Sequence, residues 1–206
     1  LGVRSLSALI LTHPQRDHVG GAAEVLRRIE VGQVLDPGLE ASGPEREKAL
    51  REARARGVPL RVVRAGSSFR VGGLVLRVHW PEDAGAAAED PNVNAVVLAA
   101  TYGRIDVLLP ADAETDVTGR LPLGPVEVLK VAHHGSEDAG LAAELEELRP
   151  RVAVISCGRD NAYGHPHPDT LAALAGATGL ETFRTDLDGR VVVESDGRTL
   201  EVRSER

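Results

Sequence analysis

Three side chains that commonly bind metal ions lie within six residues near the start of the chain. His13, Asp17 and His18 fall in the segment Thr12 to Gly21, directly after a run of apolar residues. Neutral imidazoles and a carboxylate are ligands for zinc, manganese or iron. An isolated histidine is more often a surface or core residue, whereas three ligands at one strand-to-helix junction predict a metal site.

Two further histidine pairs follow predicted strands. His133 and His134 come directly after an apolar segment, and His165 and His167 lie in a proline-stiffened loop after the next apolar segment. In layered folds, the residues that follow the strands gather at one edge of the sheet. Six of the seven histidines in the chain belong to such clusters, and this joint arrangement predicts one site more specifically than any cluster alone.

Asp112 also follows an apolar strand, and its sequence context leaves two interpretations open. The first is a helix N-cap for residues 113–118, which is a common role for aspartate. The second is a carboxylate that bridges two metal ions.

Composition limits the classes of function. The 206 residues are 42% hydrophobic and 27% charged, which is ordinary for a globular protein. A net charge of −7 argues against broad electrostatic capture of nucleic acid, but it leaves open a polyanion that binds through metal ions. The single cysteine, Cys157, excludes an internal disulfide. The chain has no run of about 18 to 20 apolar residues such as a membrane span requires.

The elements that must position these side chains alternate along the chain. Gly72-Gly73 predicts a two-residue hairpin turn, and the segment 44–56 predicts a charged, exposed helix. The pattern predicts an α/β or α+β fold with two sheets and flanking helices. The predicted strands cover residues 6–11, 33–35, 60–63, 68–71, 74–79, 95–102, 105–109, 126–132, 152–156, 181–184, 191–194 and 199–202, and the predicted helices cover 22–30, 44–56, 141–148 and 168–175.

Four motifs occur in order: THPQRDHVGG at 12–21, LLPADAE at 108–114, LKVAHHGS at 129–136 and NAYGHPHP at 161–168. Together they resemble the metallo-β-lactamase superfamily, and within it the soluble C-terminal domain of ComEC-type competence proteins, which take up DNA through the membrane. The resemblance runs from about Leu6 to the C-terminus. It implies an αββα sandwich with a metal site at the strand ends. It also implies that residues 1–206 form a single domain, an N-terminally truncated fragment without the first strands of the fold.

The resemblance also implies a ligand set for two metal ions. His13 would serve the first ion, Asp17 and His18 would serve the second, and Asp112 would bridge the two. His133 most resembles the final histidine ligand, on the second ion.

The chain departs from this pattern at Gln15, which stands where the superfamily has histidine and the ComEC branch usually has aspartate. A neutral amide is a poor ligand, so we expect the first metal site to be weakened. We expect Mn²⁺ or Zn²⁺ as the cofactor.

The remaining site residues follow from the same resemblance. Asp17, Lys130 and His165 are the expected catalytic residues. Lys130 would neutralise nearby carboxylates or reach a phosphate, and His165 would contact the phosphate or protonate the leaving group. The residues expected to line the substrate side are Asn94, His134, Ser136, Asn161, His165 and His167.

These expectations favour metal-dependent phosphodiester hydrolysis, with the chain acting as a nuclease that degrades one strand during DNA uptake. The expected partners are single- or double-stranded DNA as substrate and the membrane channel portion of the parent protein. No stable protein partner is predictable from the sequence. The expected location is the extracytoplasmic face, as a soluble domain of a membrane-anchored protein, or the cytoplasm if the chain is free-standing. Two alternatives stay open: a phosphodiesterase acting on small molecules or lipid headgroups, and a degenerate, non-enzymatic docking domain.

Overall fold

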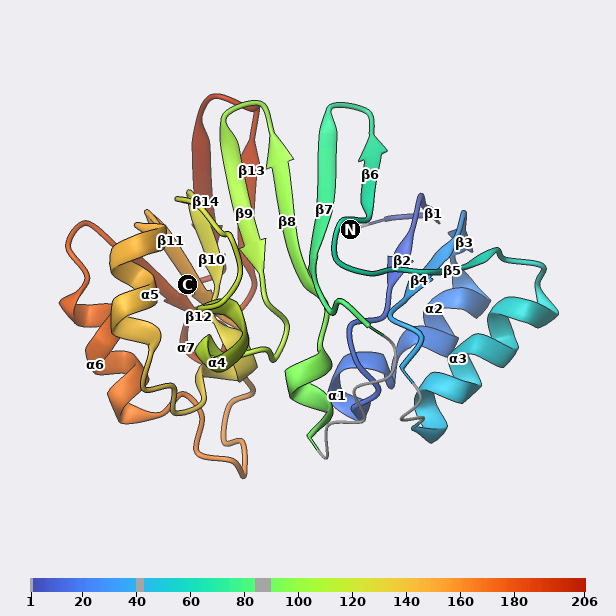
Figure 1. Ribbon diagram of the computed structural model, residues 1–206, viewed down its shortest axis with the longest axis horizontal. Coiled ribbons are helices and arrows are strands. Elements are labelled where there is room, and N and C mark those ends of the chain that lie inside the picture. The colour runs from blue at the N-terminus through green and yellow to red at the C-terminus, as the bar shows by residue number, and fades with distance from the viewer. Residues whose placement is uncertain (1, 40–42, 84–89) are drawn as a thin grey trace. The chain divides into compact units, whose positions relative to one another are not determined.

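The computed structural model describes residues 2–39, 43–83 and 90–206 (Figure 1). These residues divide into two compact units. Unit 1 comprises the described residues of Leu1–Ser67 and Val78–Val96, and unit 2 comprises Ser68–Arg77 and Val97–Arg206.

Unit 1 contains short parallel strands. The predicted strand 6–11 is two strands, because its halves pair with different partners: the first with β3 and the second with β4. β4 also pairs with β5, which gives a three-stranded parallel sheet of order β2-β4-β5. The strands are β1 (Ser5–Leu6), β2 (Leu9–Ile10), β3 (Glu30–Val31), β4 (Val34–Asp36) and β5 (Leu60–Val62).

Two helices of unit 1, α2 (Ala22–Arg28) and α3 (Pro44–Ala55), lie side by side (Figure 1). They confirm the predicted helices 22–30 and 44–56. However, the expectation that the second is an exposed helix was wrong for one of its faces. Its residues at helical spacing are buried against the core of the unit. The buried side chains of this core are Leu11, Val19, Ala22, Ala23, Leu26, Val31, Val34, Ala49, Leu50 and Ala53.

A buried ion pair joins the sheet of unit 1 to α3. Arg46 donates from Nε to Asp36 Oδ2 (2.8 Å) and from Nη2 to Asp36 Oδ1 (2.5 Å). Both side chains are 7% exposed. The backbone N–H of Gly38 also donates to Asp36 Oδ1 (2.7 Å). The buried Asp36 carboxylate therefore accepts two hydrogen bonds from Arg46 and one from the Gly38 N–H in place of hydrogen bonds from water.

Unit 2 is built on a mixed seven-stranded sheet of order β12-β11-β10-β9-β8-β7-β6. The strands from β9 to β12 run parallel, while β8 pairs antiparallel with β9 and β6 pairs antiparallel with β7. A separate antiparallel hairpin closes the chain. The strands are β6 (Ser68–Val71), β7 (Leu74–Trp80), β8 (Val97–Tyr102), β9 (Ile105–Leu109), β10 (Val128–Lys130), β11 (Val152–Ile155), β12 (Glu181–Arg184), β13 (Val191–Ser195) and β14 (Leu200–Ser204).

The register of β6 and β7 pairs Val71 with Leu74 and so confirms the predicted two-residue turn at Gly72-Gly73. Helices α5 (Leu141–Leu148) and α6 (Pro168–Gly176) pack together and confirm the predicted helices 141–148 and 168–175. Short elements that the sequence pattern did not predict are α1 (Arg16–Val19), α7 (Thr185–Asp188) and the 3₁₀ turns η1 (Pro91–Asn94) and η2 (Ala132–Gly135).

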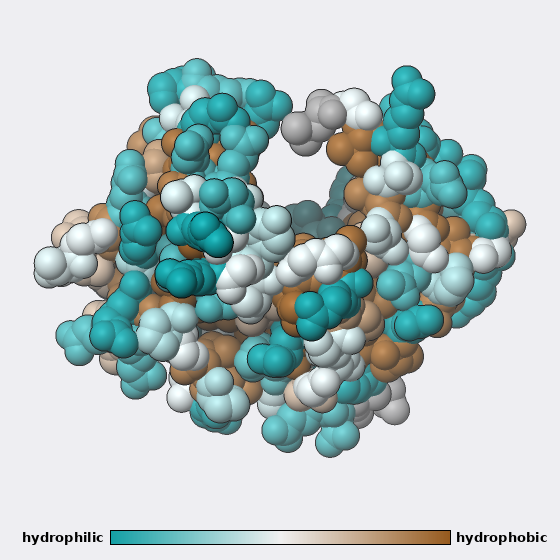
Figure 2. All heavy atoms as spheres, turned by 90° about the horizontal axis from the view of Figure 1, so that it is seen from above, coloured by the Kyte–Doolittle hydropathy of each residue, from teal (hydrophilic) through white to brown (hydrophobic). Residues whose placement is uncertain are grey.

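The predicted mixed α/β class is confirmed by this large mixed sheet and its helices. Within the ranges that the structure describes, no helix is both long and apolar enough to span a membrane. Hydrophilic side chains dominate the face shown in Figure 2, with apolar side chains in small groups among them.

One buried carboxyl group in unit 2 gives a pH-dependent prediction for stability. Burial raises the pKa of Glu144, while a hydrogen bond from Thr118 acts in the opposite direction. Within the described chain, Glu144 Oε1 is buried and has no hydrogen-bond partner. Because the folded-state pKa is raised, the ionised form disfavours folding. The stabilising contribution of this group is present below the unfolded pKa and is lost as the pH rises through the folded pKa.

We therefore expect Glu144→Gln to raise the free energy of unfolding by about 1 kcal/mol at pH 7. The gain should disappear below about pH 4, where the carboxyl group is protonated in both states. Urea unfolding at the two pH values measures both effects. Glu146→Gln, on the exposed face of the same helix, is the control. An equal effect of the control variant would contradict the role of burial.

Candidate metal centre

Several predicted site residues of unit 2 lie on loops that follow three adjacent parallel strands. Asp112 follows β9, His133 and His134 follow β10, and His165 lies in the loop after β11. Since β9, β10 and β11 are parallel neighbours, their carboxyl ends meet at one edge of the sheet. The sheet thus gathers side chains that are up to 53 residues apart in sequence (from 112 to 165).

Asp112 is not a helix N-cap. Helix α4 begins at Thr115, its N-cap is Glu114, and it ends at Thr118. The capping interpretation of Asp112 is therefore wrong. Its side chain is fully buried instead, with the backbone of the preceding Ala111 in the left-handed region (φ 54°).

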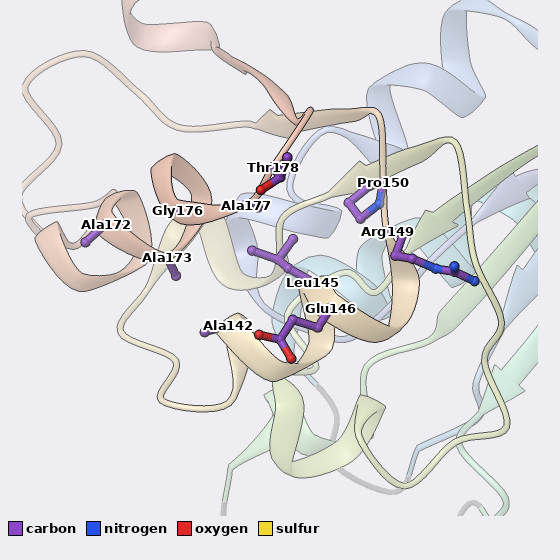
Figure 3. A pocket seen from close by; sticks show the side chains of 10 residues that line it. All are labelled: Ala142, Leu145, Glu146, Arg149, Pro150, Ala172, Ala173, Gly176, Ala177 and Thr178. Carbon is purple, nitrogen blue, oxygen red and sulfur yellow. The ribbon is translucent and has the colours of Figure 1, made fainter.

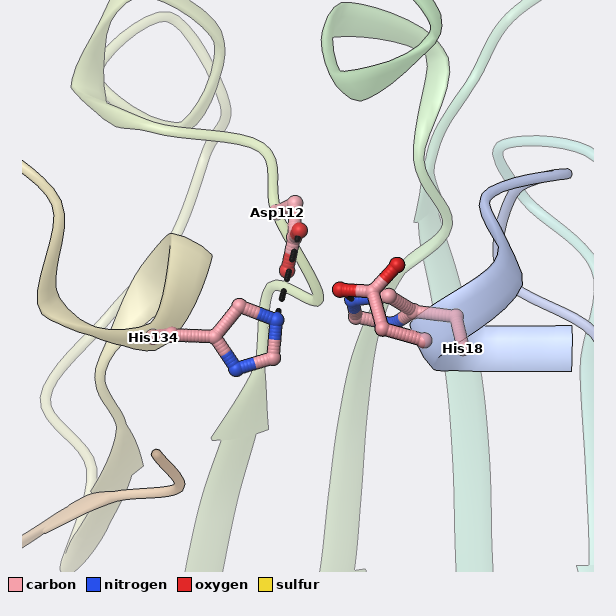
Figure 4. Close-up of side chains that lie close together, drawn as sticks. His18, Asp112 and His134 are labelled. Carbon is pink, nitrogen blue, oxygen red and sulfur yellow. Dashed lines mark ion pairs between the residues drawn. The ribbon is translucent and has the colours of Figure 1, made fainter. Parts of the chain in front are cut away.

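Two imidazoles approach the Asp112 carboxylate. The Nε2 atoms of His133 and His134 lie 3.9 and 3.7 Å from Asp112 Oδ2. Figure 4 shows the ring of His134 turned toward this carboxylate. Both histidines have left-handed backbone conformations (φ 44° and 56°), and this tight turn presents two consecutive side chains to the same carboxylate.

Hydrogen bonds on the far side of each ring define its tautomer. His134 Nδ1 lies 2.7 Å from the Ser156 carbonyl oxygen. His133 Nδ1 lies 2.7 Å from Glu114 Oε1. A carbonyl oxygen and a carboxylate are acceptors, so each Nδ1 carries the proton and each neutral ring keeps its lone pair on Nε2.

Two nitrogen lone pairs and a carboxylate oxygen thus converge on one point. A divalent cation can accept all three of these donor atoms at once. Ligand atoms around a tetrahedral zinc ion are separated by about 3.4 Å, from bond lengths near 2.1 Å. Separations of 3.7 and 3.9 Å would need to close by only a few tenths of an ångström. The residues of unit 2 therefore fit a divalent metal ion.

Lys130 lies on the other side of the same carboxylate. Its Nζ donates to the Ala111 carbonyl oxygen (2.8 Å) and lies 3.7 Å from Asp112 Oδ1. The ammonium group thus lies within ion-pair distance of the carboxylate, and the expected role of Lys130 stays a prediction. Its ammonium group also fixes the loop that carries Asp112.

The imidazole of His165 completes this group, with its ring centroid 5.8 Å from that of His133. Burial is the main cause that lowers the pKa of His165, and the nearby His133 and His134 lower it further. His165 is therefore neutral at pH 7 and can present one N–H donor and one acceptor.

Three other predicted residues support this loop region through hydrogen bonds. Asn161 donates from Nδ2 to the carbonyl oxygens of Gly158 (2.9 Å) and His165 (2.6 Å), and its Oδ1 accepts from the His165 N–H (3.0 Å). The carbonyl oxygen of Ser136 accepts from Thr170 Oγ1 (2.5 Å). These contacts are structural, and they leave the predicted substrate roles of both residues as predictions.

His167 begins helix α6. Its Nδ1 accepts from the Asp169 N–H (3.3 Å), and its Nε2 lies 3.9 Å from Glu137 Oε2. The ring is therefore used to cap a helix, and its predicted contact with substrate stays a prediction.

In unit 1 the structure brings together the predicted ligands of the first motif. His13 is fully buried, and its ring centroid lies 4.1 Å from that of His18. His18 Nε2 lies 3.5 Å from Asp17 Oδ2. Asp17 and His18 belong to the single turn of α1, which sequence periodicity cannot detect because it spans four residues.

Gln15 belongs to the same cluster, because its Oε1 lies 3.4 Å from His13 Nε2. It also serves as the N-cap residue of α1, with an extended backbone. The altered ligand position thus lies beside the imidazole expected to serve the first ion. Asn94 is buried in η1, and the N–H of nearby Val96 donates to the Thr12 carbonyl oxygen (3.1 Å).

Sequence reasoning missed one residue, Glu114, which fixes the tautomer of His133. The acidic position of the LLPADAE segment, two residues after Asp112, was available as a clue. The sequence did not reveal that Glu114 pairs with His133, which lies 19 positions away.

A pocket of about 640 Å³ lies between α5 and α6 in unit 2 (Figure 3). None of the predicted site residues lines it. Its walls are mostly small side chains, so it offers no support for a small-molecule phosphodiesterase at this place. The lining residues are Ala142, Leu145, Glu146, Arg149, Pro150, Ala172, Ala173, Gly176, Ala177 and Thr178.

Comparison with known proteins identifies the family to which this chain belongs. Residues 1–159 match the model of the metallo-beta-lactamase superfamily. The chain is 34% identical over 194 residues to ComE operon protein 3 of Bacillus subtilis, an alignment that covers 92% of this chain and 25% of that protein. It is 31% identical over 172 residues to Recombination protein 2 of Haemophilus influenzae, covering 82% of this chain and 20% of that protein.

The chain therefore spans a quarter or less of the length of these two relatives. Among solved structures, a variant of the β-hydroxylase CmlA is similar with a TM-score of 0.57 and 15% sequence identity. The match covers 89% of this chain and 44% of that one. At this identity the likeness concerns the fold alone.

Proposed function

Because this chain belongs to the metallo-β-lactamase superfamily and its relatives are ComEC-type competence proteins, we propose that it is a metal-dependent phosphodiester hydrolase that cleaves DNA. One observation carries the hydrolase part of this proposal. The Nε2 atoms of two imidazoles face a fully buried carboxylate, and this is a donor set that suits a divalent metal ion. The choice of DNA as substrate is supported by the relation to competence proteins.

We propose that metal ligands occur in both units. Unit 1 would provide His13, Asp17 and His18, and unit 2 would provide Asp112 and His133. The distances within unit 2 favour His134 as a further ligand, since its Nε2 is as close to Asp112 as that of His133. A bound pair of divalent ions, Mn²⁺ or Zn²⁺, would polarise the phosphate and lower the pKa of a water molecule.

The weakened first site is part of the proposal. An aspartate at position 15 would supply a charged oxygen, whereas Gln15 supplies a neutral amide close to His13. In consequence, activity should continue to rise at Mn²⁺ concentrations above those that fill the second site, because the first site binds Mn²⁺ weakly.

The residues of this chain have separate roles in the proposed reaction. Glu114 holds the ring of His133, and Lys130 offsets the charge of Asp112. Neutral His165 would donate a hydrogen bond to a phosphate oxygen. In this proposal His165 orients the phosphodiester, while Glu114 and Lys130 position the metal ligands His133 and Asp112.

We also propose a setting for the reaction. The relation to competence proteins supports a role in DNA uptake. The domain would belong to a membrane-anchored parent protein, lie on its extracytoplasmic face and act beside the channel portion of that protein.

The test is cleavage of single- and double-stranded DNA by the purified protein across a range of Mn²⁺ concentrations. We expect Mn²⁺-dependent cleavage that EDTA abolishes and that Asp17→Asn reduces to background, because the variant loses a charged ligand. Asp116→Asn is a matched control, since Asp116 also lies in the first turn of a four-residue helix and is exposed. It should retain wild-type activity.

Two outcomes would count against the proposal. Cleavage that survives in the folded Asp17→Asn variant would show that this ligand assignment is wrong. No cleavage by the wild-type protein at any Mn²⁺ concentration would favour a docking domain instead.

A further inference from the structure

Tyr163 is the most exposed large apolar side chain among the described residues, with 84% of its surface accessible. The chain is poor in aromatic residues: it has one tryptophan, two tyrosines and two phenylalanines. The other tyrosine, Tyr102, is 40% exposed. Core packing therefore does not explain why an aromatic ring occupies position 163.

The ring of Tyr163 stacks on the proposed substrate-binding imidazole. Its plane is within 13° of that of His165, with 6.0 Å between ring centroids. The ring of His165 lies 5.8 Å from that of His133, whose Nε2 faces Asp112. A short series of rings thus leads from the candidate metal ligands to an exposed aromatic surface.

The loop that carries Tyr163 is held at several points. The Asn161 side chain binds the backbone on both sides of the tyrosine, at Gly158 and at His165. After the loop, the His167 N–H donates to the Gly135 carbonyl oxygen (2.7 Å). Gly164, between the two rings, has a φ of 74° that favours glycine. The tyrosine is thus presented by an ordered turn.

Charge on this loop does not provide a strong phosphate-binding surface. Between Ser156 and His167, the sequence contains one basic residue of the lysine and arginine type, Arg159. Its Nε donates to the Asp186 carbonyl oxygen (3.3 Å). Affinity for a nucleic acid at this loop would therefore come from ring stacking more than from ionic contacts.

We propose that Tyr163, stacked on His165, is a platform for an unpaired nucleobase of a DNA substrate whose phosphodiester is cleaved at the metal centre. The inference rests on the proposed nuclease function and adds a preference for single strands. A base in a duplex already has neighbours on both faces, whereas an unpaired base has a free face for an aromatic ring. The preference would depend little on sequence, because every base has such a face.

The first experiment measures binding of a fluorescent single-stranded oligothymidylate in EDTA, where no hydrolysis occurs. Tyr163→Ala should weaken binding by about 5- to 100-fold, the usual range for loss of one stacked base. Tyr163→Phe keeps the ring and should restore most of the affinity. Tyr102→Ala is the matched control, since Tyr102 lies at the start of the β8–β9 turn, at the other end of the strand pair from Asp112.

A second series compares wild type and Tyr163→Ala on oligonucleotides that contain abasic sites. Their difference in affinity should shrink as bases are removed, because a sugar without a base cannot stack. The difference in affinity between wild type and Tyr163→Ala should also change little with salt concentration, since stacking involves few phosphate contacts. A purely structural role of Tyr163 would lower affinity equally for normal and abasic strands.

The outcomes separate this inference from the proposed function. DNA cleavage by the wild type, with equal single-strand binding by wild type and Tyr163→Ala, would overturn the platform and leave the nuclease. Weakened binding by Tyr163→Ala in a protein that cleaves no DNA would support the platform and overturn the nuclease. No detectable single-strand binding by the wild type would overturn the platform.

Discussion

Asp112→Asn should lower the affinity for Mn²⁺ by about 100-fold or more. Loss of a residue that only orients a metal ligand costs up to about 100-fold, and Asp112 is itself a proposed ligand. DNA cleavage should fall by about 1000-fold or more, as for loss of a strong electrostatic contact in an active site. Calorimetric titration with Mn²⁺ and the cleavage assay measure the two effects.

The same variant should leave the metal-free protein as stable as the wild type, or slightly more stable. In the wild type, the Asp112 carboxylate is fully buried, and the loss of its hydration disfavours folding when no metal ion is bound. An asparagine amide could donate a hydrogen bond to one of the Nε2 atoms. Function and stability are thus expected to change in opposite directions, as at many active sites.

Urea unfolding in EDTA distinguishes this explanation from a structural role. If Asp112 served mainly as an ionic partner of Lys130, its replacement would cost about 3 kcal/mol or more, because a buried charge would lose its partner. Asp196→Asn is the control, since Asp196 lies in the turn between β13 and β14 and its Oδ1 accepts from backbone N–H groups. It should alter neither metal affinity nor cleavage.

Arg46→Ala should lower the free energy of unfolding by about 3 to 5 kcal/mol, the usual cost of leaving one member of a buried ion pair without the other. The Asp36 carboxylate would keep a backbone hydrogen bond from Gly38 but would lose both donors of the guanidinium group. The variant would also lose a side chain that is only 7% exposed. Chemical denaturation of the metal-free protein measures the change.

Arg51→Ala is the control for Arg46→Ala, because Arg51 is exposed on the same helix. Its effect should stay within about 0.5 kcal/mol. Asp36→Val combined with Arg46→Met should cost less than the sum of the single changes, since neither charge then remains buried alone. Full additivity would show that the two side chains do not stabilise unit 1 as a pair.

Local patterns in the sequence were sufficient to predict most of the regular elements. Residues 141–148 and 168–175 have helical periodicity, and the corresponding helices α5 and α6 follow these ranges closely. The Gly72-Gly73 turn was predictable because a two-residue hairpin depends on adjacent residues. The histidine pairs were predicted as site residues because each follows an apolar segment.

Other features depend on partners that the local sequence does not reveal. The strand predicted over residues 6–11 is divided because its halves pair with different strands. Asp112 had the sequence context of a helix N-cap, yet α4 begins three residues later. Arg46 belongs to a charged helix that was expected to be exposed, and it is buried because Asp36 lies within hydrogen-bonding distance.

The sequence by itself thus determined the chemical types in the candidate metal centre: imidazoles and carboxylates placed after strands. The tertiary structure alone decided which nitrogen of each imidazole carries the lone pair. His133 depends on Glu114, 19 residues away, and His134 on the Ser156 carbonyl group, 22 residues away. The physical reason is that propensity and periodicity act between near neighbours in the chain, whereas a tautomer is fixed by whichever acceptor the folded backbone places beside the ring.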